Sequence, residues 1–317
     1  DSGSAVCVQA DAKVTIEGGD FSGGKNATLG VSGTMTVTGG TFDQDVTDYC
    51  ANGYVCELNT TTNKYEVFRG LTGKGTEANP YLIKNLSDLT FFRDHVNEGE
   101  IRYNAPGVWV ALANDIDMTD IANWTPIGNV DYNNKYIPQG PVFVGVFNGN
   151  GKVLSNLKIE EIINGGADAD ANIGLFGITG EGAVIKNLTL TNVTINTDGR
   201  NVGALAGFAY KATLDNITVN GDIQIKGGNN VSGVAGMTRH YAMSATNISV
   251  SGANGSAIVG NNIVGGIFAE IAPNGSLQTF KNLSIENVAI NGVGGVGGIV
   301  GLLTLGTVEN VSVKNVA

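Results

Sequence analysis

Carboxylates are the side chains of this sequence whose spacing comes closest to a catalytic arrangement. They occur in three close pairs, Asp115/Asp117, Glu160/Glu161 and Asp168/Asp170. Two carboxylates about 5 to 10 Å apart can hydrolyse a glycosidic bond, and carboxylates also bind Ca²⁺. However, Asp168 and Asp170 lie in a Gly/Ala-rich loop, and the outward positions of the predicted strands hold Thr, Ser and Lys. We therefore expect no enzyme and no cofactor, with a polysaccharide lyase or glycoside hydrolase as the alternative.

Metal binding is the second chemistry that the side chains could provide. The three cysteines, Cys7, Cys50 and Cys56, lie in the first fifth of the chain and show no Cys-x-x-Cys spacing. An odd number without that spacing does not predict a metal site. Cys50 and Cys56 could form a disulfide across a short loop or remain buried free thiols, and the sequence leaves both possibilities open.

The overall charge excludes two classes of partner. The 317 residues carry a formal net charge of −11, without any basic run. Nucleic-acid grooves and surfaces that bind anionic membranes need clustered Lys and Arg. No stretch approaches 18 consecutive apolar residues, so we expect no membrane insertion in this segment. Glycine accounts for 47 residues, which indicates a folded chain with many tight corners.

A repeat becomes visible from residue 156 onward. A tetrapeptide of the type Asn-apolar-polar-apolar recurs every 28 to 35 residues, beginning at Asn156, Asn187, Asn216, Asn247, Asn282 and Asn310. Its two-residue alternation predicts a short strand with apolar side chains pointing inward. Because one repeat cannot bury a core alone, we expect the repeats to stack, each strand about 4.8 Å from its counterpart.

The recurring asparagine permits two interpretations. Most of these residues begin an Asn-x-Ser/Thr sequon, which predicts N-glycosylation in a secreted protein. Asparagine also tolerates a left-handed backbone and forms amide ladders, and its constant place in the repeat favours a structural corner. A second corner is predicted five residues later, at residues that tolerate the same conformation: Asn192, Gly221, Gly252, Asn287 and Asn315.

Two further columns precede the Asn segments by about ten residues. An aliphatic residue recurs at Val146, Leu175, Leu205, Val234, Ile267 and Ile299. Beside it runs a column of tiny residues, namely Gly145, Gly174, Ala204, Gly233, Gly266 and Gly298. A third apolar stretch follows the Asn segment, for example at residues 193–195.

Three short strands per repeat predict an all-β, right-handed parallel β-helix. A leucine-rich repeat would need a Leu-rich consensus, and a propeller would need four antiparallel strands per blade.

The residues before the repeats predict an end cap. Residues 87–97 predict a helix with Ser87 as its N-cap and with Leu89, Phe92 and Val96 on one apolar face. A lone amphipathic helix before stacked strands is best explained as a cover for the first apolar level. No such segment follows the last repeat, so we expect an exposed edge, further sequence or a neighbouring molecule at Ala317.

Residues 1–69 predict a small, separate, Gly-rich β subdomain. Residues 14–21 recur as residues 35–42, an offset of 21. Residues 53–55 and 64–68 predict a hairpin. A Gly-rich linker follows, so we assign 1–69 to one domain and 70–317 to the other.

Several segments resemble the GLUG-motif proteins. They are residues 75–83 (GTEANPYLI), 114–118 (NDIDM), 124–128 (WTPIG), 146–157 (VFNGNGKVLSNL) and segments of the type VGALAG at 202–207. The resemblance covers about residues 70–317, and residues 1–69 resemble the Gly-Gly-Thr-Phe repeats found beside such regions in bacterial surface proteins. It implies a secreted or cell-surface protein of the adhesin type with a parallel β-helix, and it brings no catalytic motif.

The sequence therefore predicts an extracellular or cell-surface adhesion module that presents a face of stacked strands to a glycan or to a host or other extracellular protein. The candidate contact residues lie in loops that interrupt the repeat: Tyr132, Tyr136, Arg239, His240 and Tyr241. Aromatic rings in such loops can stack on sugar rings. A purely structural stalk is the remaining alternative.

Overall fold

The computed structural model describes residues 4–22, 29–128, 140–161, 171–239, 243–272 and 278–317. These residues form strands nearly throughout, together with one α-helix. The chain divides into two compact units, Asp1–Gly73 and Lys74–Ala317, which we call the N-terminal unit and the C-terminal unit. The division falls a few residues after the boundary at 69/70 that the sequence predicts.

The N-terminal unit consists of short strands joined by turns. They are β1 (Val6–Val8), β2 (Lys13–Ile16), β3 (Asp20–Phe21), β4 (Leu29–Val31), β5 (Thr34–Val37), β6 (Gly40–Phe42), β7 (Tyr54–Asn59) and β8 (Lys64–Arg69), with a 3-10 helix at Thr47–Tyr49. Parallel pairing joins β1 to β4, β2 to β5 and β3 to β6, whereas β8 is antiparallel to β6 and β7. The 21-residue repeat is confirmed, because Val14 pairs with Met35 and Phe21 with Phe42. β7 and β8 form the predicted hairpin.

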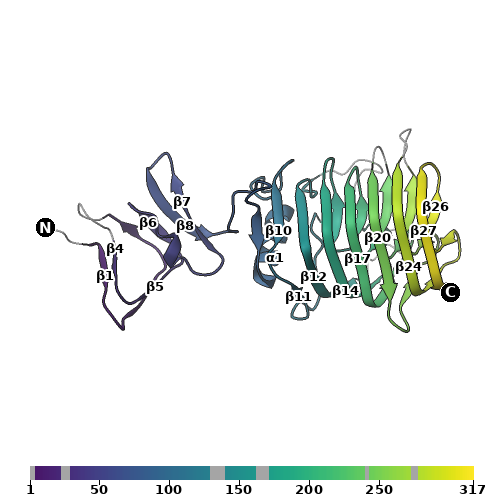
Figure 1. Ribbon diagram of the computed structural model, residues 1–317, viewed down its shortest axis with the longest axis horizontal. Helices are drawn as coiled ribbons and strands as arrows, with labels where there is room; N and C mark the ends of the chain where they lie inside the picture. The colour runs from purple at the N-terminus through teal and green to yellow at the C-terminus, as the bar shows by residue number, and fades with distance from the viewer. Residues whose placement is uncertain (1–3, 23–28, 129–139, 162–170, 240–242, 273–277) are drawn as a thin grey trace. The chain divides into compact units, whose positions relative to one another are not determined.

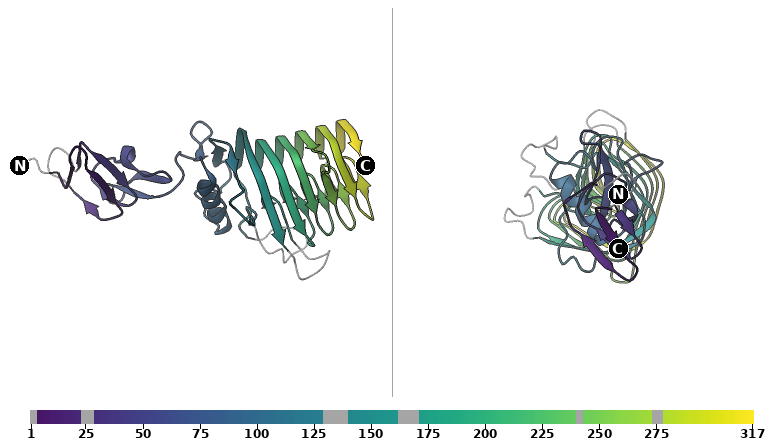
Figure 2. Two further views of the ribbon diagram at one scale, coloured as in Figure 1. Left: turned by 90° about the horizontal axis from the view of Figure 1, so that it is seen from below. Right: turned by 90° about the vertical axis from the view of Figure 1, so that its left-hand side faces the viewer.

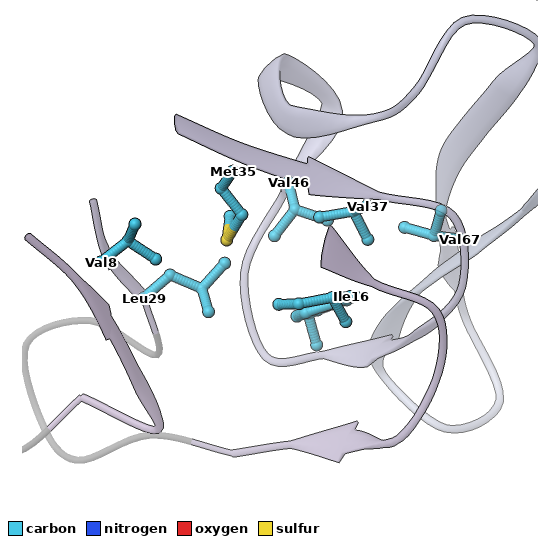
Figure 3. Packing of buried hydrophobic residues seen from close by; sticks show 8 residues of the cluster. Val8, Ile16, Leu29, Met35, Val37, Val46 and Val67 are labelled. Carbon is cyan, nitrogen blue, oxygen red and sulfur yellow. The ribbon is translucent and has the colours of Figure 1, made fainter. Parts of the chain in front are cut away.

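The two repeats of this unit enclose a small apolar core (Figure 3). Ile16, Met35 and Val37 are 6%, 7% and 0% exposed. Phe21 stacks on Phe42 with ring centroids 4.9 Å apart. Burial of each such side chain contributes about 1.5–3 kcal/mol, so a few of them hold this small unit together.

The C-terminal unit contains the α-helix and three sheets (Figure 1). Helix α1 spans Leu86–Asn97. The longest sheet contains β9 (Tyr81–Ile83), β10 (Trp109–Leu112), β11 (Ile116–Asp117), β12 (Val146–Glu161), β14 (Val184–Thr197), β17 (Thr213–Lys226), β20 (Ser244–Gly252), β21 (Ala257–Val259), β24 (Thr279–Asn291) and β27 (Thr307–Val316). The second contains β13 (Phe176–Thr179), β16 (Ala206–Ala209), β19 (Ala235–Arg239), β23 (Phe268–Ala272) and β26 (Val300–Leu303). The third contains β15 (Val202–Gly203), β18 (Val231–Ser232), β22 (Val264–Gly265) and β25 (Val296–Gly297).

Equivalent residues of successive repeats pair in parallel throughout the described part of these sheets. Leu188 pairs with Ile217, Ile217 with Ile248, and Ile248 with Leu283, and all four are at most 1% exposed. We call the contribution of one repeat to this stack a level. Figure 2 shows the levels side by side, between α1 at one end of the unit and β27 at the other. Like side chains therefore lie on like, as the columns in the sequence predict.

The long strands turn corners at residues that do not take part in the pairing, and the pairing resumes beyond each corner. In β14 the corners are Asn187 and Asn192, whose φ angles are 54° and 57°. Asparagine occupies this left-handed region at little cost. The two corners divide β14 into three straight segments. The sequence predicts the second and third of them but not the first, at 184–186, because no asparagine marks its start.

The second and third sheets approach each other so closely that little room remains for a side chain between them. A Cβ on Gly207 would lie 2.3 Å from the backbone of Asn172, and a Cβ on Gly236 would lie 2.4 Å from the backbone nitrogen of Val202. Gly301 occupies the same place in the last level, whereas Ala269 occupies it in the level before.

The predicted aliphatic column is confirmed from Leu175 to Ile299: backbone hydrogen bonds connect its members from Leu205 to Ile299, and the N–H of Leu175 donates to Ala204 O, directly before Leu205. Val146 was wrongly included, together with the neighbouring Gly145. Val146 opens β12 and pairs with residues of β10 and β14 instead. In the level that contains β10, Ile127 is the residue that reaches the second sheet, where it pairs with Phe176. The level that contains β12 has a longer first corner, at residues 148–151, so the distance from Val146 to Asn156 misplaced the register.

Helix α1 covers one end of the C-terminal unit. Its predicted apolar face is fully buried and consists of Leu89, Phe92 and Val96. The ring of Phe92 lies 5.9 Å from that of Phe147, in β12. The N-cap is Asn85 rather than Ser87, because the backbone N–H of Asp88 donates to Asn85 Oδ1 at 2.9 Å. This bond satisfies one of the free amides of the first turn.

Candidate binding groove at the second asparagine corner

Most of the predicted ligand contacts lie outside the part of the chain that the structure describes. Tyr132, Tyr136, His240 and Tyr241 are all among the undescribed residues. Arg239 ends β19, where its backbone pairs with Ala272. The candidate site is therefore built from the corner residues, which the structure describes.

Five of the six predicted corner asparagines form one column. They are Asn187, Asn216, Asn247, Asn282 and Asn310, with φ between 54° and 58°. Within the column, Nδ2 of Asn216 donates to Oδ1 of Asn187 at 3.0 Å, and Nδ2 of Asn282 donates to Oδ1 of Asn247 at 2.8 Å. Asn247 does not bond Asn216 in this way, because its Nδ2 donates instead to Oδ1 of Asp215 in the preceding level. The ladder occupies the amide nitrogen that glycosylation would modify, so the structure favours the corner interpretation.

Asn156 belongs to a different column, so the sequence register was wrong for the first repeat. The pairing of β12 with β14 aligns Asn156 with Asn192, whose Nδ2 donates to Asn156 Oδ1 at 3.1 Å. The first corner of this level is formed by residues 148–151, where Asn148 Oδ1 accepts from Asn187 Nδ2 at 3.1 Å. This corner is longer than the others. The interval from Asn156 to Asn187 therefore runs from a second corner to a first corner and does not measure the length of one repeat.

A third ladder is buried and was missed in the sequence. Asn201 Nδ2 donates to Asn172 Oδ1 at 3.1 Å, and Asn230 Nδ2 donates to Asn201 Oδ1 at 3.0 Å. Asn230 also donates to the carboxylate of Glu270 at 3.2 Å, and all four residues are at most 5% exposed. Asn172, Asn201 and Asn230 each directly precede an aliphatic segment, and this recurrence in the sequence could have revealed the third ladder.

A groove follows the second corner across four levels. Its volume is about 480 Å³, and it is lined by Thr119, Ile121, Asn156, Leu157, Lys158, Asn192, Thr194 and Asp222. These residues come from β12, β14, β17 and the turn after β11. Lys158 and Thr194 are paired neighbours, so both side chains stand on the same face of the sheet. The groove is therefore a property of the stack rather than of one loop.

A hydrogen-bond network orients the polar groups of this groove. Asp117 Oδ1 accepts from Asn156 Nδ2 at 2.8 Å and from Thr119 Oγ1 at 2.6 Å. Asn192 donates to Asn156 and, through its Oδ1, accepts from the backbone N–H of Asp222 at 3.0 Å. Because Asn156 and Asn192 each use both the Nδ2 and the Oδ1 of the amide in the network, their orientation is fixed before any ligand arrives.

The electrostatics of the groove are mixed. The side chain of Thr119, then that of Asn156, lowers the pKa of Asp117 by donating to its carboxylate. Lys158 forms an ion pair with Glu160 at 3.3 Å. Within the described residues, no protein group bonds the hydroxyl of Thr194. The arrangement offers amides, a free hydroxyl and charges of both signs, which suits hydrogen bonding to a polyhydroxylated ligand.

A second cavity lies farther along the same corner, where glycine replaces asparagine in the column. At this interruption the side chain of Ser256, 2% exposed, donates to Gly221 O at 3.2 Å and accepts from the N–H of Ile223 at 3.1 Å. The cavity measures about 540 Å³ and is lined by Gly252, Asn254, Gly255, Ser256, Asn287, Val288, Ala289 and Asn315. Both depressions thus follow the second corner.

The acidic pairs have separate structural contacts. Asp115 Oδ1 accepts from the N–H of Val153 at 2.9 Å, whereas Asp117 holds Asn156. Asp168 and Asp170 lie outside the described residues. In the described ranges, no group of three or more His, Cys, Asp or Glu side chains is arranged to hold a metal ion.

The three cysteines of the N-terminal unit are free thiols. Cys50 Sγ donates to Val46 O at 3.6 Å, and the N–H of Val46 donates to Cys56 Sγ at 3.5 Å. Burial, followed by the charges of Cys56 and Asp45, raises the pKa of Cys50 to about 11. Burial also raises the pKa of Cys56, whereas Cys7 is exposed.

Comparison with known proteins gives partial matches. No protein family matches the chain. A Gly-rich membrane protein of Evansella cellulosilytica is 36% identical over 161 residues, which are 48% of this chain and 16% of that protein. Halomucin of Haloquadratum walsbyi is 30% identical over 180 residues, 55% of this chain and 2% of halomucin. The chain thus spans less than a fifth of either relative.

One solved structure resembles the chain at low similarity. It is a proposed immunoglobulin A1 protease of Bacteroides ovatus, with 18% identity and a TM-score of 0.47 over 77% of this chain and 79% of that one. At this level of similarity it supports no inference about fold or activity. Separately, no helix among the described residues is long and apolar enough to cross a bilayer.

Proposed function

We propose that the C-terminal unit is a right-handed parallel β-helix and that the chain is an adhesion module of a bacterial surface, similar to the GLUG-motif proteins. Parallel pairing of level on level supports the fold. Right-handed winding follows from the strong preference of parallel crossovers for that hand. The names of the two relatives, a membrane protein and halomucin, support a surface or extracellular location.

The groove at the second corner is the observation that carries the binding proposal. Its amides are oriented by the network around Asn156 and Asn192, and the half-buried Ile121 adds apolar surface. A glycan combines hydroxyl groups with apolar ring faces, so both kinds of surface find a counterpart. A site built on stacked strands also loses little conformational freedom on binding. We therefore propose a glycan as the ligand.

We further propose that the groove binds its ligand without turnover. Asp117 is engaged by Thr119 and Asn156, which holds its carboxylate as an acceptor rather than as a free base. Incubation with a panel of neutral and uronic-acid polymers tests this point. Release of new reducing ends or of unsaturated uronates would restore the lyase or hydrolase alternative.

A glycan array with two arginine variants tests the binding site. Thr194→Arg fills the groove, whereas Thr218→Arg places the same side chain on another segment of the sheet, where Thr218 faces Ser249. We expect Thr194→Arg to weaken binding at least tenfold, about 1.4 kcal/mol, and Thr218→Arg to leave it within twofold. Equal loss in both variants, or the absence of any glycan ligand, would contradict the proposal. Absence of both glycan and protein ligands would favour the structural stalk.

A crystal structure tests the fold. Levels that wind to the right, with Asn187 beside Asn216, are expected. Left-handed winding, or antiparallel partners for β14 and β17, would overturn this part of the proposal.

A further inference from the structure

The column of asparagines at the second corner is interrupted in two adjacent levels. Gly221 of β17 and Gly252 of β20 pair with each other and occupy this corner between Asn192 of β14 and Asn287 of β24. Because glycine has no side chain, no side chain projects from the corner over these two levels. The groove ends at the first of them, and the second cavity begins at the next.

The interruption leaves one amide of the column without a partner in the preceding level. Elsewhere in the column, Asn192 Nδ2 donates to Asn156 Oδ1 at 3.1 Å, and Asn315 Nδ2 donates to Asn287 Oδ1 at 3.0 Å. Asn287 cannot donate in the same way, because the preceding level has Gly252 at this place. Among the described residues, nothing accepts a hydrogen bond from Asn287 Nδ2, so the cavity that it lines contains an unused donor.

An insertion of two residues forms one wall of the cavity. Gly221 and Gln224 pair with Gly252 and Ala257, so three positions of β17 correspond to five in the next level. The inserted turn contains Asn254, which is exposed and lines the cavity. No group in the described part of the chain bonds its side-chain amide. Asn254 therefore adds a second amide that is available to a ligand.

Gln224 connects the groove to the cavity. Its Nε2 donates to Oδ1 of Asp222 at 2.8 Å and to the backbone oxygen of Gly255 at 3.0 Å. Asp222 lines the groove, whereas Gly255 lines the cavity. One side chain thus holds the walls of both depressions. We call the residues that line the groove and the cavity, taken together, the corner path.

The corner path is long enough for a polymer. It crosses the levels of β11, β12, β14, β17, β20 and β24, whose five spacings of about 4.8 Å amount to about 24 Å. One hexose unit of an extended glycan is about as long as one such spacing. A chain of about five units therefore matches the path, with successive units beside successive corners.

The charges along the corner path favour a neutral chain. The described residues that line the cavity are all uncharged. In the groove, the only cation among the described lining residues is Lys158, which forms an ion pair with Glu160 at 3.3 Å. An anionic polysaccharide needs unpaired Lys or Arg along its length, and Asp222 in the middle of the path would repel it.

We propose that the ligand is a neutral, extended glycan of about five or more units that lies along the corner path, parallel to the direction in which the levels stack. The inference rests on the proposed function and extends it from a short glycan to a polymer. One part of the chain occupies the groove. Another part occupies the cavity, where Asn254 and Asn287 donate to its hydroxyl groups. Because both parts belong to one molecule, binding of the first raises the effective concentration of the second.

The dependence of affinity on chain length tests the proposal. Cello-, xylo-, manno- and chito-oligosaccharides of about two to eight units are titrated against the intact chain by calorimetry, beside oligogalacturonates of the same lengths as the charged comparison. We expect the affinity of a neutral series to rise at least about tenfold between three and six units and to change little beyond that length. Oligogalacturonates should bind more weakly than the neutral series at every length.

Two arginine variants of β24 separate the cavity from the groove. Ala289→Arg fills the cavity, whereas Ser284→Arg places the same side chain on another segment of the strand, beside Ser249 and Ser312. A three-unit chain fits within the groove alone. We therefore expect Ala289→Arg to weaken binding of a six-unit chain at least about fivefold and to leave a three-unit chain unchanged. Ser284→Arg should affect neither length, and circular dichroism should show both variants folded.

A third variant makes the test independent of any disturbance of the sheet. Asn254→Ala changes only an exposed turn, and it should weaken six-unit binding about twofold or more without affecting three units. Equal affinity for three and six units, or equal effects of Ala289→Arg at both lengths, would overturn the extended chain and leave the groove as a site for a short glycan. Tighter binding of oligogalacturonates would overturn its neutral character. Failure of every series to bind would instead contradict the proposed function itself.

Discussion

Asn282 and Asn247 are 35 residues apart in the chain, yet Nδ2 of the first lies 2.8 Å from Oδ1 of the second. Both hold a left-handed backbone at the same corner of neighbouring levels, with φ of 56° and 58°. Glycine would satisfy the backbone alone, and glutamine would supply the amide alone. Asparagine satisfies both requirements, which explains its persistence at this corner.

Replacement of Asn216 should separate these two contributions. Asn216→Ala loses the bond to Asn187 and places a Cβ-bearing residue without a polar side chain at φ 54°. We expect a loss of about 2 kcal/mol in the free energy of unfolding, measured by urea denaturation. Asn216→Gly should cost about 1 kcal/mol, since it loses only the hydrogen bond. Equal losses in the two variants would mean that backbone conformation contributes nothing.

Replacement of Gly207 tests the close approach of the second and third sheets. Gly207→Ala would place its Cβ 2.3 Å from the backbone of Asn172, so one of the sheets must shift. We expect a loss of about 1–3 kcal/mol by chemical denaturation, as for other overpacked cores. Gly18→Ala is the control, because a Cβ there meets nothing within 4 Å. Similar stability of both variants would show that the sheets yield without cost.

The low pKa of Asp117 predicts a stability that depends on pH. Donation by Thr119 and Asn156 favours the ionised form in the folded chain. The contribution is therefore complete above about pH 5 and is lost as the pH falls below the ordinary aspartate value of about 3.9 and through the lowered pKa. Urea denaturation at pH 7, 4 and 2.5 should show a steeper acid loss for the wild type than for Asp117→Asn. Parallel curves would exclude a role for this carboxylate, and Asp120→Asn provides a neighbouring control.

The thiols should react in two classes. Cys7 is exposed, whereas burial raises the pKa of both Cys50 and Cys56 and so lowers their thiolate fraction. A disulfide reagent at pH 8 should modify one thiol rapidly and two slowly, and Cys7→Ser should remove the fast phase. Three thiols should react in denaturant. Detection of one thiol in denaturant would instead demonstrate a disulfide between Cys50 and Cys56.

The repeat made much of the C-terminal unit predictable. Alternation around Asn187, Asn216 and Asn282 gives the strands, and the recurrence of apolar residues gives their register, because each level repeats the environment of the level before it. The levels that contain β10 and β12 could not be aligned in this way. Residues 148–151 lengthen the first corner of the β12 level, and Ile127, in the β10 level, reaches the second sheet only through an isolated bridge to Phe176.

The site was harder to predict than the strands. The aromatic loop residues were chosen because they interrupt the repeat, but a loop has no repeating neighbour to fix its position. The groove, by contrast, combines Thr119 of a turn with Asn156, Asn192 and Asp222 of three levels. Such a combination follows only from the correct register of the β12 level, which the spacing of asparagines misidentified.

The side-chain amides at the corners also constrain how the length of such a chain can change. Each amide needs a neighbour at the same corner of the adjacent level, as Asn216 needs Asn187. Deletion of a few residues inside a strand would slide the corners of that level out of alignment, whereas a change outside the strands would not, because the joined asparagines are 28 to 35 residues apart. Natural length variants of this unit should therefore keep the strands intact and differ between them or by whole levels.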